Sequence, residues 1–258
     1  MRNVAVEAAR FLAMHADQQI TLHDVADHVS YSPFHLARSF ERVIGVPPGH
    51  YLASQRFQRA KQILLTCDDS VLDVCYAVGF NSVGTFTSRF RSAVGVTPTQ
   101  FRRLPDQIGS PVRPIRIIGP AGRGAVVSGA IRMSSAAVAL AGARPSIYVG
   151  LFARRDPRGV PVAGALLTGT TDYVLTGVPS GTFWVLASAL STHADSHAQL
   201  VPKQTVSGGA PQPIHAGPDN LAHRRDLFLD IAADWAAPVL VALPALATAG
   251  AQDRRRQA

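Results

Sequence analysis

An internal repeat, with an offset of about fifty residues, constrains the fold of this chain more than any other feature. The run ARSFERVIGVPP at residues 37–48 returns as TSRFRSAVGVTP at residues 87–98. Just upstream the offset is forty-nine, because DVADHVSY (24–31) aligns with DVCYAVGF (73–80), so the second copy has one extra residue, Asn81. A repeat of this kind predicts that one local structure is built twice.

Each copy has the pattern of a helix, a tight turn and a second helix. In both copies a serine, Ser32 or Ser82, precedes the second apolar-periodic segment and is expected to cap it. Pro33 suits the first turn of a helix, and Gly79 tolerates a positive φ in the turn. Helix, turn and helix in this order predict a helix-turn-helix unit. The periodic segment at residues 49–66 predicts one long helix that joins the two units.

Residues 106–123 change the character of the chain. They are rich in proline and glycine, and the apolar periodicity beyond them shortens to the two-residue period of strands. The predicted strands are 124–133, 146–155, 162–167, 172–178, 182–190, 226–232 and 238–244. Seven short strands predict an all-β sandwich after an all-α domain. The predicted organisation is a domain at 1–105, a linker at 106–123, a sandwich at 124–246 and a disordered basic tail at 247–258.

Composition narrows the environment and the class of partner. The chain has 258 residues, 47% of them hydrophobic, which allows two domains with their own cores and excludes wholesale disorder. No apolar run reaches the ~18 residues of a membrane span, and two cysteines are too few for a disulfide framework. The prediction is a cytoplasmic protein without a membrane partner. The net charge of +8 favours a polyanionic partner but does not say which half binds it.

The second copy, SVLDVCYAVGFNSVGTFTSRFRSAVGVTPTQFRR, resembles the AraC-type transcription factors, and the resemblance extends over residues 3–104. It implies a helical reader of double-stranded DNA with one DNA-contacting helix in each copy. We expect an activator with RNA polymerase as a further partner, and the sequence leaves the choice between activation and repression open. Two such helices fit successive major grooves about 34 Å apart. The family's base-reading positions fall on Phe34, Ala37 and Arg38 in the first copy and on Val83, Gly84, Thr85 and Ser88 in the second. The phosphate-contact candidates are Arg42, Thr87, Arg89 and Arg91.

The two copies differ in what they offer to DNA. Arg38 is the strongest base-reading candidate, because a guanidinium can bind O6 and N7 of guanine together. Ser88 stands at the equivalent place in the second copy. We therefore expect unequal reading, with most base specificity in the first copy and phosphate contacts in the second. Three cations of the linking helix, Arg56, Arg59 and Lys61, are expected on a solvated face.

The C-terminal half resembles prealbumin-like and carboxypeptidase-regulatory-like β-sandwiches, chiefly through the hairpin VPSGTFWVLA. Its predicted role is to bind a small-molecule or protein effector, or a second copy of the chain, and the oligomeric state is left open. We expect its aromatic residues to lie mainly in the core, Trp184 being the one that a partner could reach. No catalytic residue, cofactor or metal site is predicted. Two alternatives remain: a DNA-tethered metal-dependent enzyme that uses His193 and His197, with Asp195 between them, and a scaffold that senses nothing.

Overall fold

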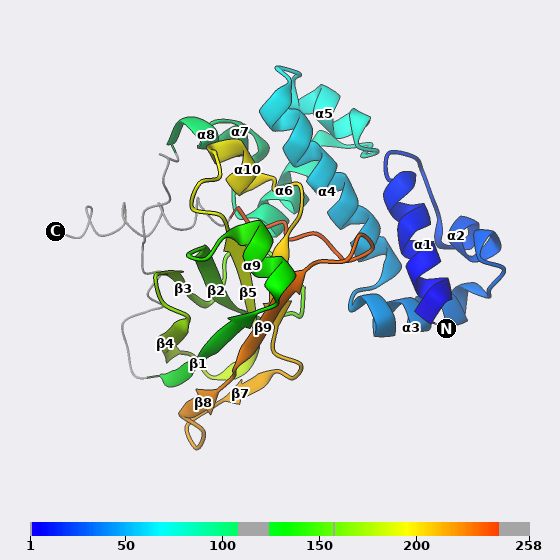
Figure 1. Ribbon diagram of the computed structural model, residues 1–258. Helices are drawn as coiled ribbons and strands as arrows, with labels where there is room; N and C mark the ends of the chain where they lie inside the picture. Colours follow the sequence, from blue (N-terminus) through cyan, green and yellow to red (C-terminus); the bar gives the residue numbers. More distant parts are fainter. Residues whose placement is uncertain (1, 108–123, 157, 243–258) are drawn as a thin grey trace. The chain divides into compact units, whose positions relative to one another are not determined.

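The computed structural model describes residues 2–107, 124–156 and 158–242 (Figure 1). Two compact units emerge. The helical unit runs to Arg102 and also includes Ala233–Leu240, whereas the sheet unit begins at Arg103, runs to Ala232 and resumes at Val241. The predicted tail and all but the first residues of the predicted linker lie outside the described residues.

Seven helices form the main part of the helical unit. They are α1 (Arg2–Met14), α2 (Leu22–His28), α3 (Pro33–Ile44), α4 (Pro48–Thr66), α5 (Val71–Ala77), α6 (Val83–Val94) and α7 (Pro98–Arg102). The pairs α2/α3 and α5/α6 have equal lengths, seven and twelve residues, as the repeat predicts. The predicted long joining helix is α4, with nineteen residues.

Matching caps set the ends of the two repeated helices. Ser32 accepts a hydrogen bond from the backbone N–H of His35, and Ser82 accepts the equivalent bond from Thr85, each at 3.4 Å. Both helices end at a glycine in the left-handed conformation, Gly45 at φ 89° and Gly95 at φ 96°. A residue with a Cβ is disfavoured at this backbone conformation, so the two glycines stop the helices at the same point.

Aromatic side chains fill the interior of the helical unit. In the first copy the rings of Phe40 and Tyr51 meet edge to face, with centroids 5.5 Å apart. In the second copy the ring of Phe57 on α4 lies 5.8 Å from the ring of Phe90, which in turn lies 5.8 Å from the ring of Phe101. These contacts hold α3 and α6 against α4 through one apolar face and leave the opposite face of each helix outward.

The described part of the sheet unit begins with a single-turn helix and contains nine strands and two further short helices. In chain order these are α8 (Leu104–Gln107), β1 (Ala125–Met133), α9 (Ser135–Ala141), β2 (Ser146–Phe152), β3 (Ala163–Thr168), β4 (Asp172–Val178), β5 (Gly181–Leu190), α10 (Ser196–Leu200), β6 (Val206–Gly209), β7 (Ile214–Ala216), β8 (Ala222–Arg224) and β9 (Leu227–Ile231). The strand order is β3-β2-β5-β6-β9-β1-β4, with β7 on β5 and β8 on β1.

The predicted two-sheet sandwich is wrong, because the described strands form one continuous sheet. Strand β9 joins its two halves: it pairs antiparallel with β6, through Val206 and Ile231, and parallel with β1, through Ile131 and Leu227. The sheet curls so far that β3 and β4, at opposite ends of the strand order, lie side by side. One curled sheet therefore covers its own apolar face, which a sandwich does with two sheets.

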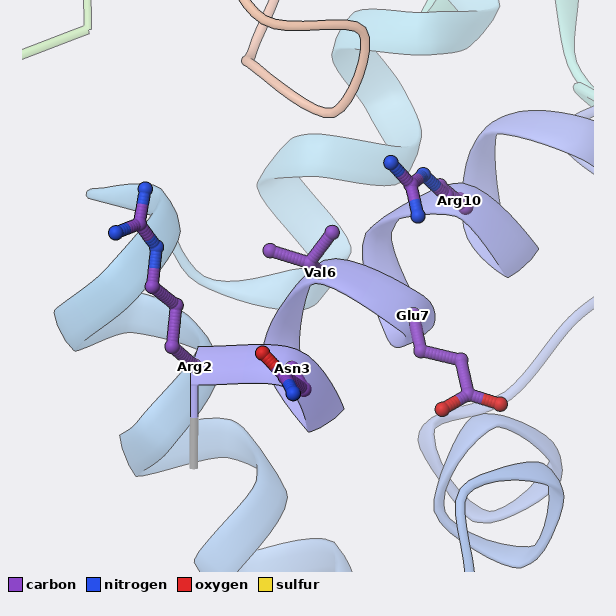
Figure 2. A pocket seen from close by; sticks show the side chains of 5 residues that line it. All are labelled: Arg2, Asn3, Val6, Glu7 and Arg10. Carbon is purple, nitrogen blue, oxygen red and sulfur yellow. The ribbon is translucent and has the colours of Figure 1, made fainter.

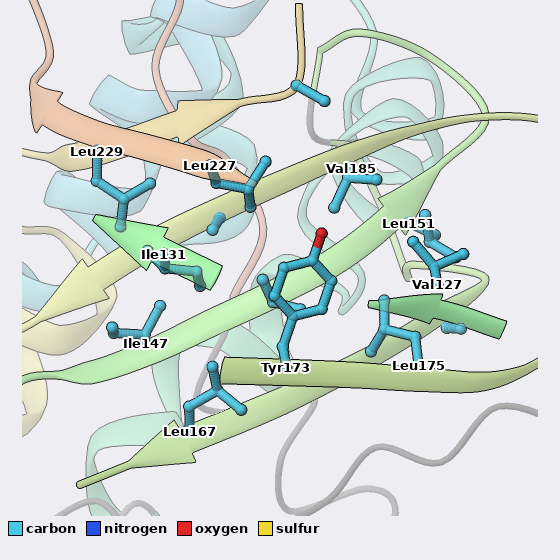
Figure 3. Packing of buried hydrophobic residues seen from close by; sticks show 14 of the residues in the cluster. Val127, Ile131, Ile147, Leu151, Leu167, Tyr173, Leu175, Val185, Leu227 and Leu229 are labelled. Atoms are coloured by element: carbon cyan, nitrogen blue, oxygen red, sulfur yellow. The ribbon is translucent and has the colours of Figure 1, made fainter. Parts of the chain in front are cut away.

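The core of the sheet unit lies on the concave side of the curl (Figure 3). Figure 3 shows Tyr173 among leucine, isoleucine and valine side chains from several strands, and its hydroxyl donates a hydrogen bond to the carbonyl of Arg225. Two glycines let backbones approach closely: a Cβ would lie 2.0 Å from the carbonyl oxygen of Arg225 at Gly129, and 2.1 Å from that of Phe228 at Gly208. The pairing of β1 and β6 with the rest of the curl thus depends on positions without a side chain.

Six of the seven strands that local patterns predicted are present in the structure. The exception is 238–244, whose described residues, 238–242, form no strand; Ala233–Leu240 belongs instead to the helical unit. Strands β6, β7 and β8 were not predicted, because three or four residues are too few for a periodic pattern. None of the described helices is long and apolar enough to cross a membrane.

Candidate nucleic-acid interface

The outward face of α3 carries the base-reading candidates of the first copy. Leu36 and Phe40 are fully buried on the inner face of α3. On the other face Phe34 is 66% exposed, Arg38 is exposed and Ala37 is half-buried. Phe34 therefore lies on the outward face of α3 beside Arg38, where a binding partner can reach both side chains.

Arg38 and Phe34 form a pair on this surface. They are four residues apart on α3, and the guanidinium carbon of Arg38 lies 5.7 Å from the centroid of the Phe34 ring. A cation over an aromatic face is held by the ring quadrupole but keeps its N–H donors at the edge of the guanidinium plane. The pair therefore presents a planar set of donors beside an apolar ring, which suits the edge of a guanine and the methyl group of a thymine.

The outward face of α6 has the same position in its helix pair but carries small side chains. Phe86 and Phe90 are fully buried, whereas Gly84, Thr85 and Ser88 are exposed. The two remaining candidates, Val83 and Thr87, are half-buried. The surface of α6 thus offers hydroxyl and methyl groups close to the helix, without a long side chain that reaches outward.

Exposed arginines flank both helices. Arg42 lies in the last turn of α3, where α6 has Ser92, and Arg91 lies in the last turn of α6, where α3 has Glu41. Arg89 aligns with Ser39 of the first copy. Arg89 is exposed, whereas Ser39 is buried. The arginine candidates are therefore accessible, and each helix carries two arginines, at positions that the two copies do not share.

Two of the three cations of α4, Arg56 and Lys61, do not lie on a solvated face as predicted, whereas Arg59 is exposed. The guanidinium of Arg56 donates hydrogen bonds to the carbonyl oxygens of Ala16 and Gln18, each at 2.7 Å. Arg59 forms an ion pair with Asp17 at 3.2 Å, and Lys61 is only 1% exposed. Periodicity could have identified Lys61 as buried, because it lies four residues after Phe57 and three before Leu64 on the apolar stripe of α4. Arg56 and Lys61 are therefore structural cations.

A C-terminal segment of the helical unit, Ala233–Leu240, packs on α1, and sequence reasoning placed it in the second domain. The Arg10 guanidinium donates to both carboxylate oxygens of Asp234, at 3.1 and 3.4 Å. The guanidinium carbon of Arg2 lies 5.9 Å from the ring centroid of Trp235, and Trp235 packs against the apolar cluster that contains Ala8 and Leu12. We call residues 233–240 the strap.

Figure 2 shows the face of α1 next to these contacts. A hollow of about 440 Å³ is lined by side chains of successive turns of α1, namely Arg2, Asn3, Val6, Glu7 and Arg10. Two of the five, Arg2 and Arg10, are the side chains that hold the strap. The exposed face of α1 is thus a surface that binds chain from beyond β9.

The strap leads to a first prediction. Replacing Trp235 by alanine is expected to lower the free energy of unfolding of the helical unit by about 1–2 kcal/mol, because a half-buried aromatic side chain is lost from the cluster around Leu12. Hydrogen exchange should show faster opening in α1 and no change in the β strands. The control is the other tryptophan, Trp184 on β5, whose replacement by alanine should leave exchange in α1 unchanged. Equal protection of α1 in wild type and Trp235→Ala would contradict a stabilising strap.

The alternative metal site is not assembled. Asp195 caps α10 by accepting a hydrogen bond from the N–H of Ala198 at 2.7 Å, and His197 lies within that five-residue helix. His193 and His197 are both exposed. Among the residues that the structure describes, no three His, Cys, Asp or Glu side chains are grouped so that they could hold a metal ion.

Comparison with known proteins points to one region of the chain. A protein-family profile described as "Helix-turn-helix domain" matches residues 25–104. The chain is 34% identical over 97 residues to the melibiose operon regulatory protein of Escherichia coli (strain K12). This match covers 38% of this chain and 32% of that protein. The chain is also 32% identical over 84 residues to the HTH-type transcriptional activator AarP of Providencia stuartii. This match covers 33% of this chain and 62% of AarP. The chain thus matches about a third of the first relative and less than two thirds of the second.

Solved structures match the same region. A transcriptional regulator from Chromobacterium violaceum, with an AraC-type DNA-binding domain, is 28% identical and covers 42% of this chain and 96% of its own, with a TM-score of 0.40. The DNA-binding domain of AdpA, solved in complex with a target DNA, is 27% identical and covers 41% of this chain and 97% of its own, with a TM-score of 0.38. From the profile and the sequence relatives, residues 25–104 are an AraC-type helix-turn-helix domain, and the proteins that share it are AraC/XylS regulators.

Proposed function

We propose that this protein is a sequence-specific DNA-binding regulator of transcription in which α3 and α6 enter successive major grooves of one DNA duplex. The observation that carries the proposal is the pair of equal, equally capped helices, each with a buried inner face and an exposed outer face that holds the predicted contacts. Two helix-turn-helix units joined by α4 would place their recognition helices about 34 Å apart on one side of the duplex. The protein would act in the cytoplasm as a non-enzymatic activator, with RNA polymerase as a further partner.

Within this proposal the two units read DNA unequally. Arg38, beside Phe34, would read guanine in the first groove, with Ala37 close enough for an apolar contact with a base. In the second groove Thr85 and Ser88 would add weaker contacts, next to Val83 and Gly84. Binding there would rest mainly on phosphate contacts of Thr87, Arg89 and Arg91, with Arg42 in the same role at the first groove.

The experiment that tests the proposal is selection of bound duplexes from a random DNA pool by the full chain at a fixed, stated salt concentration. We expect enrichment of a site with two conserved parts separated by about one helical turn, or about 10 base pairs, and with the more strongly conserved part containing guanine. Affinity should fall steeply with salt, because each neutralised phosphate releases a counterion. A pool that stays random after selection would contradict the proposed function.

The role proposed for the sheet unit is to bind an effector or a second copy of the chain. The chain that directly follows β9 contacts α1, which packs on α3, so the strap is a continuous connection from the sheet unit to the first recognition helix. A ligand that shifts the end of β9 would therefore act on the first recognition helix through Asp234 and Trp235. Binding of the selected DNA with and without candidate ligands, in wild type and in Trp235→Ala, tests this route.

A further inference from the structure

Besides Phe80 in place of Tyr31, the turn of the second helix pair differs from the turn of the first in two residues. Gly79 stands where the first copy has Ser30, and Asn81 has no counterpart in the first copy. Elsewhere the two pairs have the same helix lengths, the same serine caps and the same terminal glycines. Each of the two differences lies at a contact with the loop between α1 and α2, which belongs to the first half of the helical unit.

Hydrogen bonds tie that loop to the second turn. The side-chain amide of Gln19 donates to the carbonyl oxygen of Gly79 at 3.0 Å and lies 3.3 Å from the side-chain oxygen of Asn81. These residues are sixty and sixty-two positions apart in sequence, so the bonds connect the first half of the helical unit directly to the turn of the second copy. The extra residue of the second copy therefore supplies one of the acceptors.

Arg56 on α4 completes the connection from the other side. Its guanidinium donates to the carbonyl oxygens of Ala16 and Gln18 and lies 5.5 Å from the ring centroid of Phe80. Phe80 directly follows Gly79 and is buried against Phe57 and Phe86. One half-buried cation thus contacts both the loop of the first half and the turn of the second.

Glycine is the only residue type that fits at position 79 without a shift of the backbone. Its φ is +84°, and a Cβ would lie 2.7 Å from the carbonyl oxygen of Asp17 and 3.1 Å from the guanidinium carbon of Arg56. The equivalent Ser30 also has a positive φ, 53°, but it is exposed. The glycine is therefore required by the approach of the α1–α2 loop, and not by the turn alone.

We propose that residues 16–19, Arg56 and residues 79–81 form a clasp that fixes the distance and angle between the recognition helices α3 and α6. The inference rests on the proposed function, since it concerns how two readers share one duplex. Helix α4 joins the two halves at one place only, and a single helical connection leaves a pivot. The clasp adds a second connection, next to the N-terminal end of α6, which makes the two readers one rigid body.

A rigid pair of readers accepts only DNA in which its two half-sites have the right separation. Adding or removing one base pair turns one half-site by about 34° around the duplex axis, because about 10.5 base pairs make a turn. A protein held by the clasp must then lose the contacts of one reader or deform the DNA. Gln19 and Asn81 are accordingly positioning residues that set spacing preference without touching DNA.

The test compares the affinity of the full chain for its selected site with its affinity for the same site carrying one base pair more or less between the halves. Gln19→Ala and Asn81→Ala are the test variants, and Gln62→Ala is the matched control, because it removes the same kind of side chain from an exposed position outside the clasp. Each lost hydrogen bond corresponds to about a twofold to tenfold factor. We expect the preference for the selected spacing to fall by about that factor in the test variants, with affinity for an isolated half-site unchanged and the variants still folded, as a cooperative melting transition would show.

The outcomes separate the clasp from the proposed function. If wild type enriches no sequence, the proposed function fails and the clasp with it. If wild type enriches a two-part site but Gln19→Ala and Asn81→Ala keep its full spacing preference, the clasp is overturned and the function stands. Gly79→Ala is the stronger second variant, since its Cβ pushes the loop away: a spacing preference as sharp as that of wild type in this folded variant would also overturn the clasp.

Discussion

Replacing Lys61 by methionine is expected to raise the free energy of unfolding at pH 7 by about 1–3 kcal/mol, because the native state then no longer buries an ammonium group. Lys61 is 1% exposed, and its burial lowers the pKa of the side chain from 10.5 to about 7. The ammonium nitrogen lies 5.7 Å from the ring centroid of Phe101, a contact that offsets part of this cost. Methionine keeps the unbranched shape and fills the same space without a charge.

The stability gained by Lys61→Met should decrease as the pH rises. Because the pKa of Lys61 is lower in the folded chain than in the unfolded one, the unfolded state binds the proton more tightly between pH 7 and pH 10.5. The contribution of Lys61 to stability therefore improves as the pH rises through this window, and its full cost is present below pH 7. The advantage of the methionine variant should accordingly be largest near pH 6 to 7 and shrink as pH 10 is approached.

Urea unfolding of wild type and Lys61→Met at a series of pH values measures this difference in the free energy of unfolding. The contributions of the other titrating groups are the same in both proteins and cancel. Gln62→Met is the matched control: it introduces the same side chain at the next position of α4, which is exposed. Its effect should stay within about 0.5 kcal/mol at every pH. A methionine variant that is less stable than wild type, or a difference that does not change with pH, would show that the ammonium is not desolvated in the native state.

The helical unit could be predicted almost completely from the sequence, because its determinants are local. Ser32 and Ser82 stand one residue before helix starts, and Gly45 and Gly95 take the left-handed conformation that ends them. Capping and chain reversal need only a few neighbouring residues, so their signals are readable in a single sequence. The repeat then transfers each assignment from one copy to the other.

The order of the sheet could not be predicted, because it depends on pairs that are far apart in the chain. Ile131 pairs with Leu227 in a parallel register, and nothing near either residue specifies the partner. The same applies to Trp235, whose packing partners lie more than 200 residues away on α1. Short strands and long-range partners thus account for the errors in the C-terminal half, whereas the individual longer strands were predicted well.

Some of the missed residues had a readable signal. Lys61 lies on the apolar stripe of α4, and a charge at such a position indicates burial more than solvation when the flanking stripe is fully apolar. Asn81 breaks the offset of the repeat, and a break in an otherwise regular repeat marks a contact that the other copy does not make. By contrast, the position of Arg56 on α4 gives no such signal in the sequence. Only the structure shows that its guanidinium donates to the carbonyl oxygens of Ala16 and Gln18.

Replacing Arg38 by alanine is expected to relax base specificity at one position of the selected site by about fivefold to a hundredfold, the equivalent of losing a bidentate contact to guanine worth ~1–3 kcal/mol. The side chain is exposed on α3 and touches Phe34, so its removal should leave the fold intact and change stability by no more than about 0.5 kcal/mol. Ser88→Ala at the equivalent place on α6 removes only a hydroxyl, worth about 0.5–1.5 kcal/mol if it is hydrogen-bonded to a base.

Two comparisons decide whether Arg38 reads a base. Arg42→Ala, a matched loss of a guanidinium one turn further along α3, should weaken binding to all sequences alike and lower the salt slope by about one, as loss of a phosphate contact does. Arg38→Ala should instead broaden the sequences recovered by selection while the second half-site stays as it is in wild type. If Ser88→Ala broadens the selected sequences more than Arg38→Ala does, the second helix is the principal reader and the unequal division of roles is reversed. Unequal reading follows from the number of donors, since the guanidinium of Arg38 can donate hydrogen bonds to both O6 and N7 of one guanine, whereas the hydroxyl of Ser88 can donate only one.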